Sequence, residues 1–296
     1  SGRGTNAPSR AAASMLAAIE RGKTLDEARD RLDGLAPNDR AFSNAIVLAA
    51  LRHYGEIEAI LQPFMKRAIP ARPHLAKALL YIGVAQIVYL EVPPHAAINE
   101  TVSATGRREQ PFRGLINAVL RRVVDAMPVT PDPLAALPDW MVETWQNAYG
   151  AETCAAMAET LQGMPPLDLQ FTSAQAASQF IDALTEKIQA EALQTTALSA
   201  DCVRLVGAGA VEKLPLFDDG VWWVQDIAAS LPARLMDLPP AAQVLDICAA
   251  PGGKTLQLAA RGAQVTAVDI SAARVKRLND NLRRTKLSAD CITADF

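Results

Sequence analysis

The sequence predicts three successive regions: an all-α helix bundle, a small mixed α/β segment, and the first half of a parallel α/β domain. Three observations carry this prediction. Apolar residues recur at spacings of three and four over residues 9–125. Short apolar runs alternate with Gly, Pro and Asp over 167–237, and a strand–helix–strand–helix–strand pattern fills 241–296. A length of 296 residues suits two or three domains of ordinary size.

The first region, residues 1–127, is predicted to be entirely helical. Its helices are separated by breaks at 34–38, 70–73, 93–94 and 106–114, which leave connections of the length that helix bundles use. Residues 128–139 then contain four prolines, which cannot continue a helix and favour an extended connector. We therefore expect a domain linker there.

The second region, residues 140–238, is predicted to be the small α/β segment that precedes the last domain. It begins with a helix over 140–161, with the large side chains expected to pack: Trp140, Trp145, Tyr149 and Met157. Short strands are predicted at 167–172, 202–206 and 221–224.

The third region, residues 239–296, has the clearest pattern. Strands are predicted at 243–248, 264–270 and 289–294, a helix at 254–261, and a second helix from the cap Ser271 to about Lys286. Strands joined by single helices at this spacing pair in parallel through right-handed crossovers. The basic residues of the second helix are expected to solubilise its outer side. The region is therefore predicted to be the start of a Rossmann-like domain.

Composition excludes several classes of protein. The chain is 50% hydrophobic and 21% charged, which is typical of a globular protein and not of a disordered one. The longest apolar stretch, residues 78–90, is shorter than the ~18 residues that a membrane span needs. No secretion signal is visible, so we expect a cytoplasmic protein, without a membrane partner and monomeric. The four cysteines lie more than forty positions apart and the three histidines are scattered, so no metal site is predicted.

The net charge of −3 conceals an asymmetry along the chain. Residues 1–130 carry 17 basic and 12 acidic side chains, residues 131–240 carry 4 and 15, and residues 241–296 carry 8 and 5. A polyanion would be attracted to the two ends and repelled by the middle. Arginines near the end of the helical region could form an RNA-facing patch, or simply solvate helix faces: Arg107, Arg108, Arg113, Arg121 and Arg122.

The turn after the first strand of the third region contains the residues that we expect to bind a ligand. It runs Asp246-Ile-Cys-Ala-Ala-Pro-Gly-Gly-Lys-Thr255 between a strand and a helix. Gly252 and Gly253 would let the backbone approach a ligand, and the helix N-terminus offers N–H donors. Asp269 ends the next strand, where it could accept hydrogen bonds from ribose hydroxyls, and Asp295 ends the third strand, where it could face a base.

Three nucleotide-binding interpretations compete for this turn. A P-loop requires glycine at the position of Cys248, and the G-x-G-x-x-G of a dinucleotide site is absent. A nucleoside cofactor without phosphates remains, and S-adenosylmethionine satisfies that description. The alternative is a turn whose glycines only pack. The predicted cofactor-binding residues are Cys248, Ala249, Ala250, Pro251, Gly252, Gly253, Lys254, Asp269 and Asp295.

These residues resemble a known family. Residues 246–255 look like the DxCAAPGGKT signature of the RNA 5-methylcytosine methyltransferases, and 225–228 resemble their upstream QDxA element. The helical region resembles a NusB-type RNA-binding domain at 39–42, 51–52, 92–96, 99–102 and 115–121. A NusB-like domain, a linker and a methyltransferase domain, in that order, are similar to the bacterial 16S rRNA cytosine-5 methyltransferases of the RsmB/Sun type.

The resemblance implies S-adenosylmethionine-dependent methylation of cytosine C5 in 16S ribosomal RNA. In the family a cysteine thiolate attacks cytosine C6 and a second cysteine assists product release, from a PCxGxG-like and a TCS-like motif. Neither motif occurs here, so we expect the nucleophile beyond Phe296 and a fragment inactive alone. No catalytic residue is assigned, because none of the four cysteines fits. The chain also departs from the family's LRxN-like strand, with Leu-Asp-Leu-Gln at 167–170.

Two other functions stay open. The helical region could make the chain a non-catalytic binding module of NusB type, which recognises RNA or a ribosomal partner. A methyltransferase for a small molecule would not need a basic helical domain.

Overall fold

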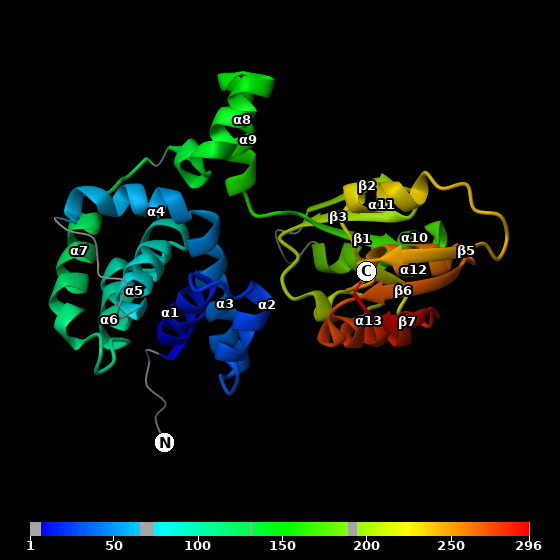
Figure 1. Ribbon diagram of the computed structural model, residues 1–296, viewed down its shortest axis with the longest axis horizontal. Coiled ribbons are helices and arrows are strands. Elements are labelled where there is room, and N and C mark those ends of the chain that lie inside the picture. Colours follow the sequence, from blue (N-terminus) through cyan, green and yellow to red (C-terminus); the bar gives the residue numbers. More distant parts are fainter. Residues whose placement is uncertain (1–6, 66–73, 131, 189–193, 296) are drawn as a thin grey trace. The chain divides into compact units, whose positions relative to one another are not determined.

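The computed structural model describes residues 7–65, 74–130, 132–188 and 194–295, in two compact units, Ser1–Met164 and Pro165–Phe296 (Figure 1). The predicted break at 70–73, together with Pro131 and Phe296, lies outside the described residues. Within the described ranges, no helix combines the length and the apolar character that crossing a membrane requires.

The first unit is helical, as predicted. Its α-helices are α1 (Ala7–Ile19), α2 (Leu25–Ala28), α3 (Pro37–Arg52), α4 (Tyr54–Leu61), α5 (His74–Val84), α6 (Pro94–Ser103), α7 (Arg113–Asp125), α8 (Asp139–Tyr149) and α9 (Ala151–Gln162). Short turns of 3-10 helix are η1 (Arg29–Leu32), η2 (Gln62–Phe64), η4 (Gln110–Phe112) and η5 (Pro133–Ala136), and η3 (Ala85–Tyr89) is a π-helical turn.

The core of the bundle forms where α1 packs against α3 and α5. Met15 and Leu16 of α1 are fully buried, as are Ile46 of α3 and Ile82 of α5. Pro37 and Pro94 each stand at the start of a helix, where a missing N–H costs nothing. The apolar spacing in the sequence therefore marks the buried faces correctly.

The proline-rich segment is more ordered than a plain extended connector. Its turn η5 is capped by Asp132, whose Oδ1 accepts from the Leu134 N–H at 2.9 Å. Gln162 of α9 donates to the Pro133 carbonyl at 3.0 Å. A Cβ placed on Gly55 of α4 would lie 1.8 Å from the Ala135 carbonyl oxygen. The segment thus packs against α4 and α9, and the boundaries of the functional domains stay a prediction.

Replacement of Gly55 by Ala is expected to loosen this packing and to cost about 1–3 kcal/mol of unfolding free energy, because a backbone carbonyl cannot move aside easily. Gly114 of α7 is the matched control, since nothing lies within 4 Å of its Cβ position. Gly114→Ala should leave stability unchanged or raise it by up to about 1 kcal/mol. Urea unfolding measures both variants, and equal midpoints would contradict the packing described.

The helix predicted over 140–161 is two helices, α8 and α9, broken at Gly150 with φ of 84°. Trp140 and Tyr149, predicted to pack, are 64% and 59% exposed. In these two fully described helices only Cys154 and Ala158 are buried. A two-helix hairpin buries one narrow face, so the prediction for Trp140 and Tyr149 was wrong.

The second unit begins with a four-stranded antiparallel sheet in the order β2-β3-β1-β4. Its strands are β1 (Leu167–Phe171), β2 (Gln194–Ser199), β3 (Cys202–Val206) and β4 (Trp222–Val224), with α10 (Ala174–Ile188) and the 3-10 turn η6 (Val211–Lys213). Phe171, Phe180 and Trp222 form its buried aromatic core, with Phe180 between the other two rings. The three predicted strands are confirmed, whereas β2 was missed because Thr-rich, half-exposed residues give no apolar run.

The second sheet is parallel, in the order β5-β6-β7, as predicted. Its elements are β5 (Gln243–Ile247), β6 (Gln264–Asp269) and β7 (Asp290–Thr293), preceded by α11 (Ile227–Arg234) and joined by α12 (Gly253–Ala260) and α13 (Ala272–Thr285). Ser271 caps α13 by accepting from the Arg274 N–H.

The two faces of this parallel sheet differ. Ala267 of β6 is fully buried in one cluster with Leu256 of α12 and Leu278 of α13. On the other face Leu245 and Ile247 are each 51% exposed and Ile292 is 47% exposed. The helices therefore cover one side of the sheet and leave an apolar stripe on the opposite side.

Candidate functional site

The carboxyl ends of the three parallel strands bring the predicted site residues together. The Ala249 N–H donates to the Val268 carbonyl at 2.9 Å, which fixes the turn after β5 beside the end of β6. The Ala294 N–H donates to the Asp269 carbonyl at 3.2 Å, which fixes the segment after β7 on the other side. The turn 248–254, Asp269 and Asp295 thus lie at one edge of the sheet.

Polar contacts tie the turn to the neighbouring strand and helix. Thr255 donates its hydroxyl to Asp246 Oδ2 at 2.6 Å, which ties the first turn of α12 to β5. Asn281 of α13 donates to the Pro251 carbonyl at 2.9 Å. Cys248 has φ of 62°, is exposed, and turns the chain out of the strand. The helix α12 begins at Gly253, directly after the turn, and its first N–H groups have no acceptor within the helix.

The two glycines of the turn make room for protein side chains. A Cβ on Gly252, whose φ is 113°, would lie 2.4 Å from Leu278 Cδ1, and a Cβ on Gly253 would lie 3.3 Å from the side chain of Gln225. Close packing against Leu278 and Gln225 is therefore sufficient to explain why both positions are glycine, as the alternative interpretation of the turn expects. Their contact with a cofactor stays a prediction.

The Asp269 side chain is buried and hydrogen-bonded to the backbone around the turn. It is 2% exposed, and its Oδ2 accepts from the Ala250 N–H at 3.2 Å and lies 3.3 Å from Arg274 Nη1. Its Oδ1 accepts from the Ser271 N–H at 3.1 Å. A carboxylate has about four lone-pair positions, so one on Oδ1 is left. The carboxylate can therefore position the turn and accept at most one further hydrogen bond.

Asp295 and Lys254 present a different environment, because both are exposed. Asp295 follows Ala294, whose N–H is bonded to Asp269, so the two aspartates lie on neighbouring strand ends. A carboxylate in this position can accept hydrogen bonds from a ligand that lies across the edge of the sheet.

Sequence reasoning missed two arginines that it assigned to a solvated helix face. Arg274 pairs with Asp269 and also donates to the Ala250 carbonyl. Arg284 donates to the Phe217 and Trp222 carbonyls, both at 3.0 Å, and lies over the Phe217 ring. Burial holds the pKa of Arg284 below its ordinary value. The signal for Arg274 was its place in the first turn of the helix that follows Asp269.

Two of the four cysteines lie in surroundings that disfavour a thiolate, and the assignment of no catalytic cysteine in this chain stays a prediction. Burial raises the pKa of Cys202 to about 11. Burial and the neighbouring Asp290 also raise the pKa of Cys291. Cys154 is buried, and Cys248 stands in the turn itself. The described residues contain no group of three His, Cys, Asp or Glu side chains that could hold a metal ion.

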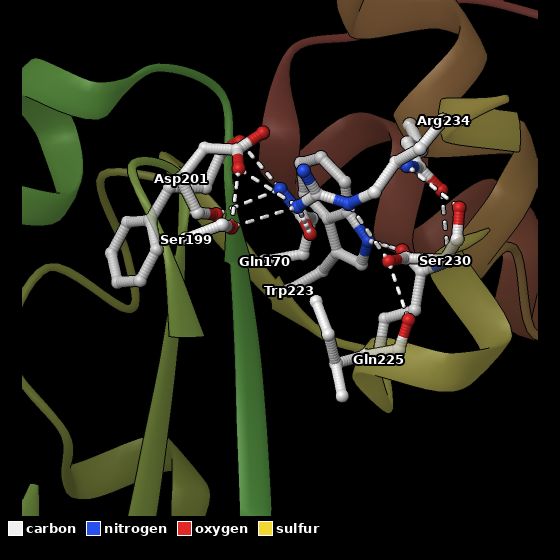
Figure 2. A network of polar contacts seen from close by, with 10 residues as sticks. Gln170, Ser199, Asp201, Trp223, Gln225, Ser230 and Arg234 are labelled. Atoms are coloured by element: carbon white, nitrogen blue, oxygen red, sulfur yellow. Dashed lines mark hydrogen bonds and ion pairs between the residues drawn. The ribbon is translucent and has the colours of Figure 1, made fainter. Parts of the chain in front are cut away.

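Gln225, the first residue of the QDxA element, links the end of β4 to α12 and belongs to the polar network drawn in Figure 2. Gln225 is 6% exposed; it accepts from Trp223 Nε1 at 2.8 Å and donates to Gln257 Oε1 at 3.0 Å. Gln257, on α12, donates in turn to the Ser230 carbonyl of α11 at 3.1 Å. Asp226 caps α11 by accepting from the Ala228 N–H at 2.8 Å. Gln225 therefore sets the position of α12, and with it the position of the turn.

Gln225→Ala is expected to lower the unfolding free energy by about 2–3 kcal/mol, because it leaves Trp223 Nε1 and Gln257 Oε1 buried without partners. Gln264→Ala is the control, since Gln264 is an exposed glutamine at the start of β6 in the parallel sheet, and it should change stability by less than about 0.5 kcal/mol. Thermal unfolding followed by circular dichroism compares the two. A Gln225 variant as stable as the control would contradict a stabilising role for the hydrogen bonds of Gln225 with Trp223 and Gln257.

Strand β1 contains the residues that depart from the family's LRxN-like pattern, and its polar side chains Asp168 and Gln170 are buried. Asp168 accepts from Arg204 Nε and Nη2 at 2.7 and 2.8 Å and from the Ile227 N–H at 3.0 Å. Gln170 accepts from Arg234 Nη2 at 2.7 Å, and the same Nη2 donates to Asp201 at 2.7 Å (Figure 2). Burial opposes ionisation of Asp168, but the hydrogen bonds from Arg204 and Ile227 outweigh it and lower the pKa. Asp168 and Gln170 thus hold α11 to the sheet and are not placed to contact RNA.

A parallel sheet with α12 and α13 on one face and two aspartates at its carboxyl edge has the architecture of part of a Rossmann-like α/β domain. Family models match two parts of the chain. The NusB family covers residues 7–125, and the family described as 16S rRNA methyltransferase RsmB/F covers residues 233–296. The chain belongs to the RsmB family of ribosomal RNA methyltransferases, with an N-terminal NusB domain and a partial methyltransferase domain.

Individual relatives agree with this assignment. The chain is 37% identical over 283 residues to ribosomal RNA small subunit methyltransferase B of Xanthomonas campestris pv. campestris, covering 93% of the chain and 64% of the relative. It is 33% identical over 296 residues to the protein of that name from Yersinia pseudotuberculosis serotype O:1b, covering 96% and 68%. The chain therefore spans about two thirds of these relatives.

A solved structure shares the fold. The crystal structure of PH0851 superposes with a TM-score of 0.71 at 16% identity, covering 99% of this chain and 70% of that one. The identity is low, so the likeness concerns the fold alone.

Proposed function

We propose that this chain is the RNA-recognising and cofactor-binding part of an enzyme that methylates C5 of a cytosine in 16S ribosomal RNA with S-adenosylmethionine. One observation carries the proposal: the turn 248–254, Asp269 and Asp295 converge at one edge of the parallel sheet. The methyltransferase family match of residues 233–296 supports the cofactor, and the two relatives that carry the name support the substrate.

The residues present fit such a cofactor in charge and in hydrogen-bonding capacity. The turn from Cys248 to Lys254 and the N-terminus of α12 offer N–H donors to a carboxylate tail. The exposed Asp295 can accept from the nucleoside, and the remaining lone pair of Asp269 Oδ1 can accept one ribose hydroxyl. S-adenosylmethionine, when bound, supplies an electrophilic methyl group. Asp269 acts mainly by positioning, because it holds Ala250 and Arg274.

The nucleophilic cysteine of the proposed mechanism is not among the four that this chain contains. The pKa values of Cys202 and Cys291 are raised by burial, the opposite of what a thiolate needs. We place the nucleophile in a part of the enzyme outside these 296 residues, and we expect the chain alone to bind cofactor without turnover. Residues 1–127 would bind RNA as a NusB-like domain, 128–139 would link it to 140–238, and 239–296 would bind the cofactor in a monomer.

Titration calorimetry with S-adenosylmethionine tests the cofactor assignment on this chain directly. We expect the wild type to bind S-adenosylmethionine with a saturable heat signal, and Asp295→Ala to bind it with about tenfold lower affinity. ATP should give no binding heat, because its phosphates would need a phosphate-binding loop. A folded protein that gives no heat with S-adenosylmethionine would contradict the assignment.

The second candidate function is a binding module of NusB type, in which the parallel sheet is passive. The burial of Asp269 and the filling of both glycine positions by protein side chains favour it. Two results together would support this function. The chain would retain 16S rRNA fragments on filters with an affinity that falls steeply as the salt concentration rises, since phosphate contacts give that dependence. Calorimetry with S-adenosylmethionine would give no binding heat.

A further inference from the structure

The first unit contains a groove that shares no residue with the predicted cofactor site. It lies mainly between α4, α5 and residues 134–139, which include most of η5 and the start of α8. Its volume is about 940 Å³, near the upper end of the range of about 300–1,000 Å³ that ligand pockets show. Gly55 of α4 packs directly against the Ala135 backbone, so elements in contact with each other form the walls.

The lining of the groove combines apolar surface with a few charged groups. Its leucines and tyrosines are Leu61, Leu80, Leu134, Leu137, Tyr54 and Tyr81. Leu61 and Leu80 are buried and form an apolar floor. Among the described lining residues, the charged ones are Glu58 from α4, Lys77 from α5 and Asp139 from α8. Such a lining suits a ligand that has both an apolar part and a charged part.

The positive charge of Lys77 is already offset within the fold. Its Nζ lies 3.4 Å from Glu20 Oε1 and donates to the Tyr54 hydroxyl at 2.8 Å. The same nitrogen lies 5.2 Å and 4.9 Å from the ring centres of Tyr54 and Tyr81, which is within the reach of a cation–π interaction. Lys77 therefore offers little attraction to an anionic ligand.

The two acidic side chains of the lining have no such partners. Glu58 and Asp139 are exposed, and neither makes a hydrogen bond or an ion pair with another described residue. The acidic character continues beyond the groove, since residues 123–164 contain six acids and no Lys, Arg or His. The basic residues at 66–73 lie outside the described residues. The charge of the described groove thus favours a cationic ligand and disfavours RNA.

We propose that this groove docks a basic, partly apolar segment of a partner protein. A Lys or Arg side chain of that segment packs its stem along the leucine floor and places its cationic head beside Glu58 and Asp139. Long basic side chains combine these two contacts well, because the stem is apolar and only the head needs polar partners. The docking site is separate from the cofactor edge of the parallel sheet and does not depend on the proposed RNA substrate.

Fluorescence anisotropy of the 296-residue chain with labelled peptides tests the groove. The probe is a peptide of about twelve residues that repeats Lys-Leu-Arg, and the reference peptide has Ser in place of each Leu. Glu58→Gln and Asp139→Asn are each expected to weaken binding of the probe about threefold, and together about tenfold. The reference peptide should bind about tenfold more weakly than the probe, because it has no apolar side chains to cover the leucine floor.

Glu143→Gln is the matched control for the two acidic positions. Glu143 lies one turn after Asp139 in α8, is also exposed, carries the same charge and does not line the groove. At physiological salt the control should change the affinity for the probe by less than about twofold, because exposed charges are screened over about 8 Å.

Several outcomes would overturn the proposal. No binding of the probe at low salt, equal affinity for the two peptides, or an equal loss in Glu143→Gln would each do so. A labelled single-stranded RNA whose affinity falls in Glu58→Gln but not in Glu143→Gln would assign the groove to RNA. Probe affinity that rises when Lys66→Gln, Arg67→Gln and Arg72→Gln are combined would assign the groove to that segment of the chain itself. Circular dichroism confirms that each variant is folded.

Discussion

Asp269→Ala is expected to abolish S-adenosylmethionine binding, with a loss of at least about 100-fold in affinity. The substitution removes the acceptor of the Ala250 and Ser271 N–H groups and the partner of Arg274, so the turn loses its fixed conformation. Loss of two of these three contacts to a charged group, at about 1.5 kcal/mol each, is enough to account for a 100-fold change in affinity. Calorimetry measures the affinity, and urea unfolding measures an accompanying loss of about 2–3 kcal/mol in unfolding free energy.

Two variants separate a positioning role from a general effect of charge. Asp269→Asn keeps the shape and one acceptor oxygen, so it should recover part of the stability lost in Asp269→Ala but bind the cofactor weakly. Asp290→Ala, at the exposed start of β7 in the same sheet, should leave both quantities unchanged. Full cofactor affinity in Asp269→Ala would refute the assigned role.

Asp168→Ala is expected to lower the unfolding free energy of the second unit by about 3 kcal/mol. It leaves Arg204 and the Ile227 N–H without their acceptor at a site where the carboxylate side chain is 1% exposed. The exposed Asp182 of α10 provides the control, because Asp182→Ala removes the same charge and should cost less than about 0.5 kcal/mol.

The effect of Asp168 should depend on pH in a defined direction. Its pKa is lowered in the folded state, so the carboxylate stabilises the fold above the unfolded-state pKa of about 3.9. That contribution is lost as the pH falls through the folded pKa. Urea unfolding at pH 7 and at pH 3 should therefore show a smaller difference between wild type and Asp168→Ala at pH 3. An unchanged difference would contradict the ion pair as its source.

The sequence predicted the parallel sheet almost residue by residue because each of its boundaries has a local chemical cause. Ser271 caps α13, Gly262 follows α12, and the apolar runs of β5 and β6 are short and bounded. The same reasoning failed for the helix over 140–161, since Gly150 breaks it and two of its large side chains, Trp140 and Tyr149, stay more than half exposed. Periodicity identifies one face of a helix but does not show whether another element covers that face.

The candidate site was predictable in position but not in its internal contacts. The order of strands and turns is sufficient to place Asp269 and Asp295 on adjacent strand ends. It does not reveal that Asp269 turns inward to Ala250 and Arg274, or that Gln225 fills the space beside Gly253. Ala250 and Asp269 lie 19 positions apart, and Gln225 and Gly253 lie 28 apart, so no local pattern reveals these two contacts. Arg274 lies only five positions after Asp269, and its place in the first turn of α13 was the one local signal.

The half-exposed Leu245, Ile247 and Ile292 have a practical consequence for handling this protein. A fluorescent dye that senses apolar surface, such as ANS, should brighten in the presence of the native chain, without any denaturant. In the described chain, the outer strands β5 and β7 of this sheet are also each unpaired on one side. The apolar stripe and the open strand edges should together make concentrated samples aggregate unless a mild detergent or a binding partner covers them.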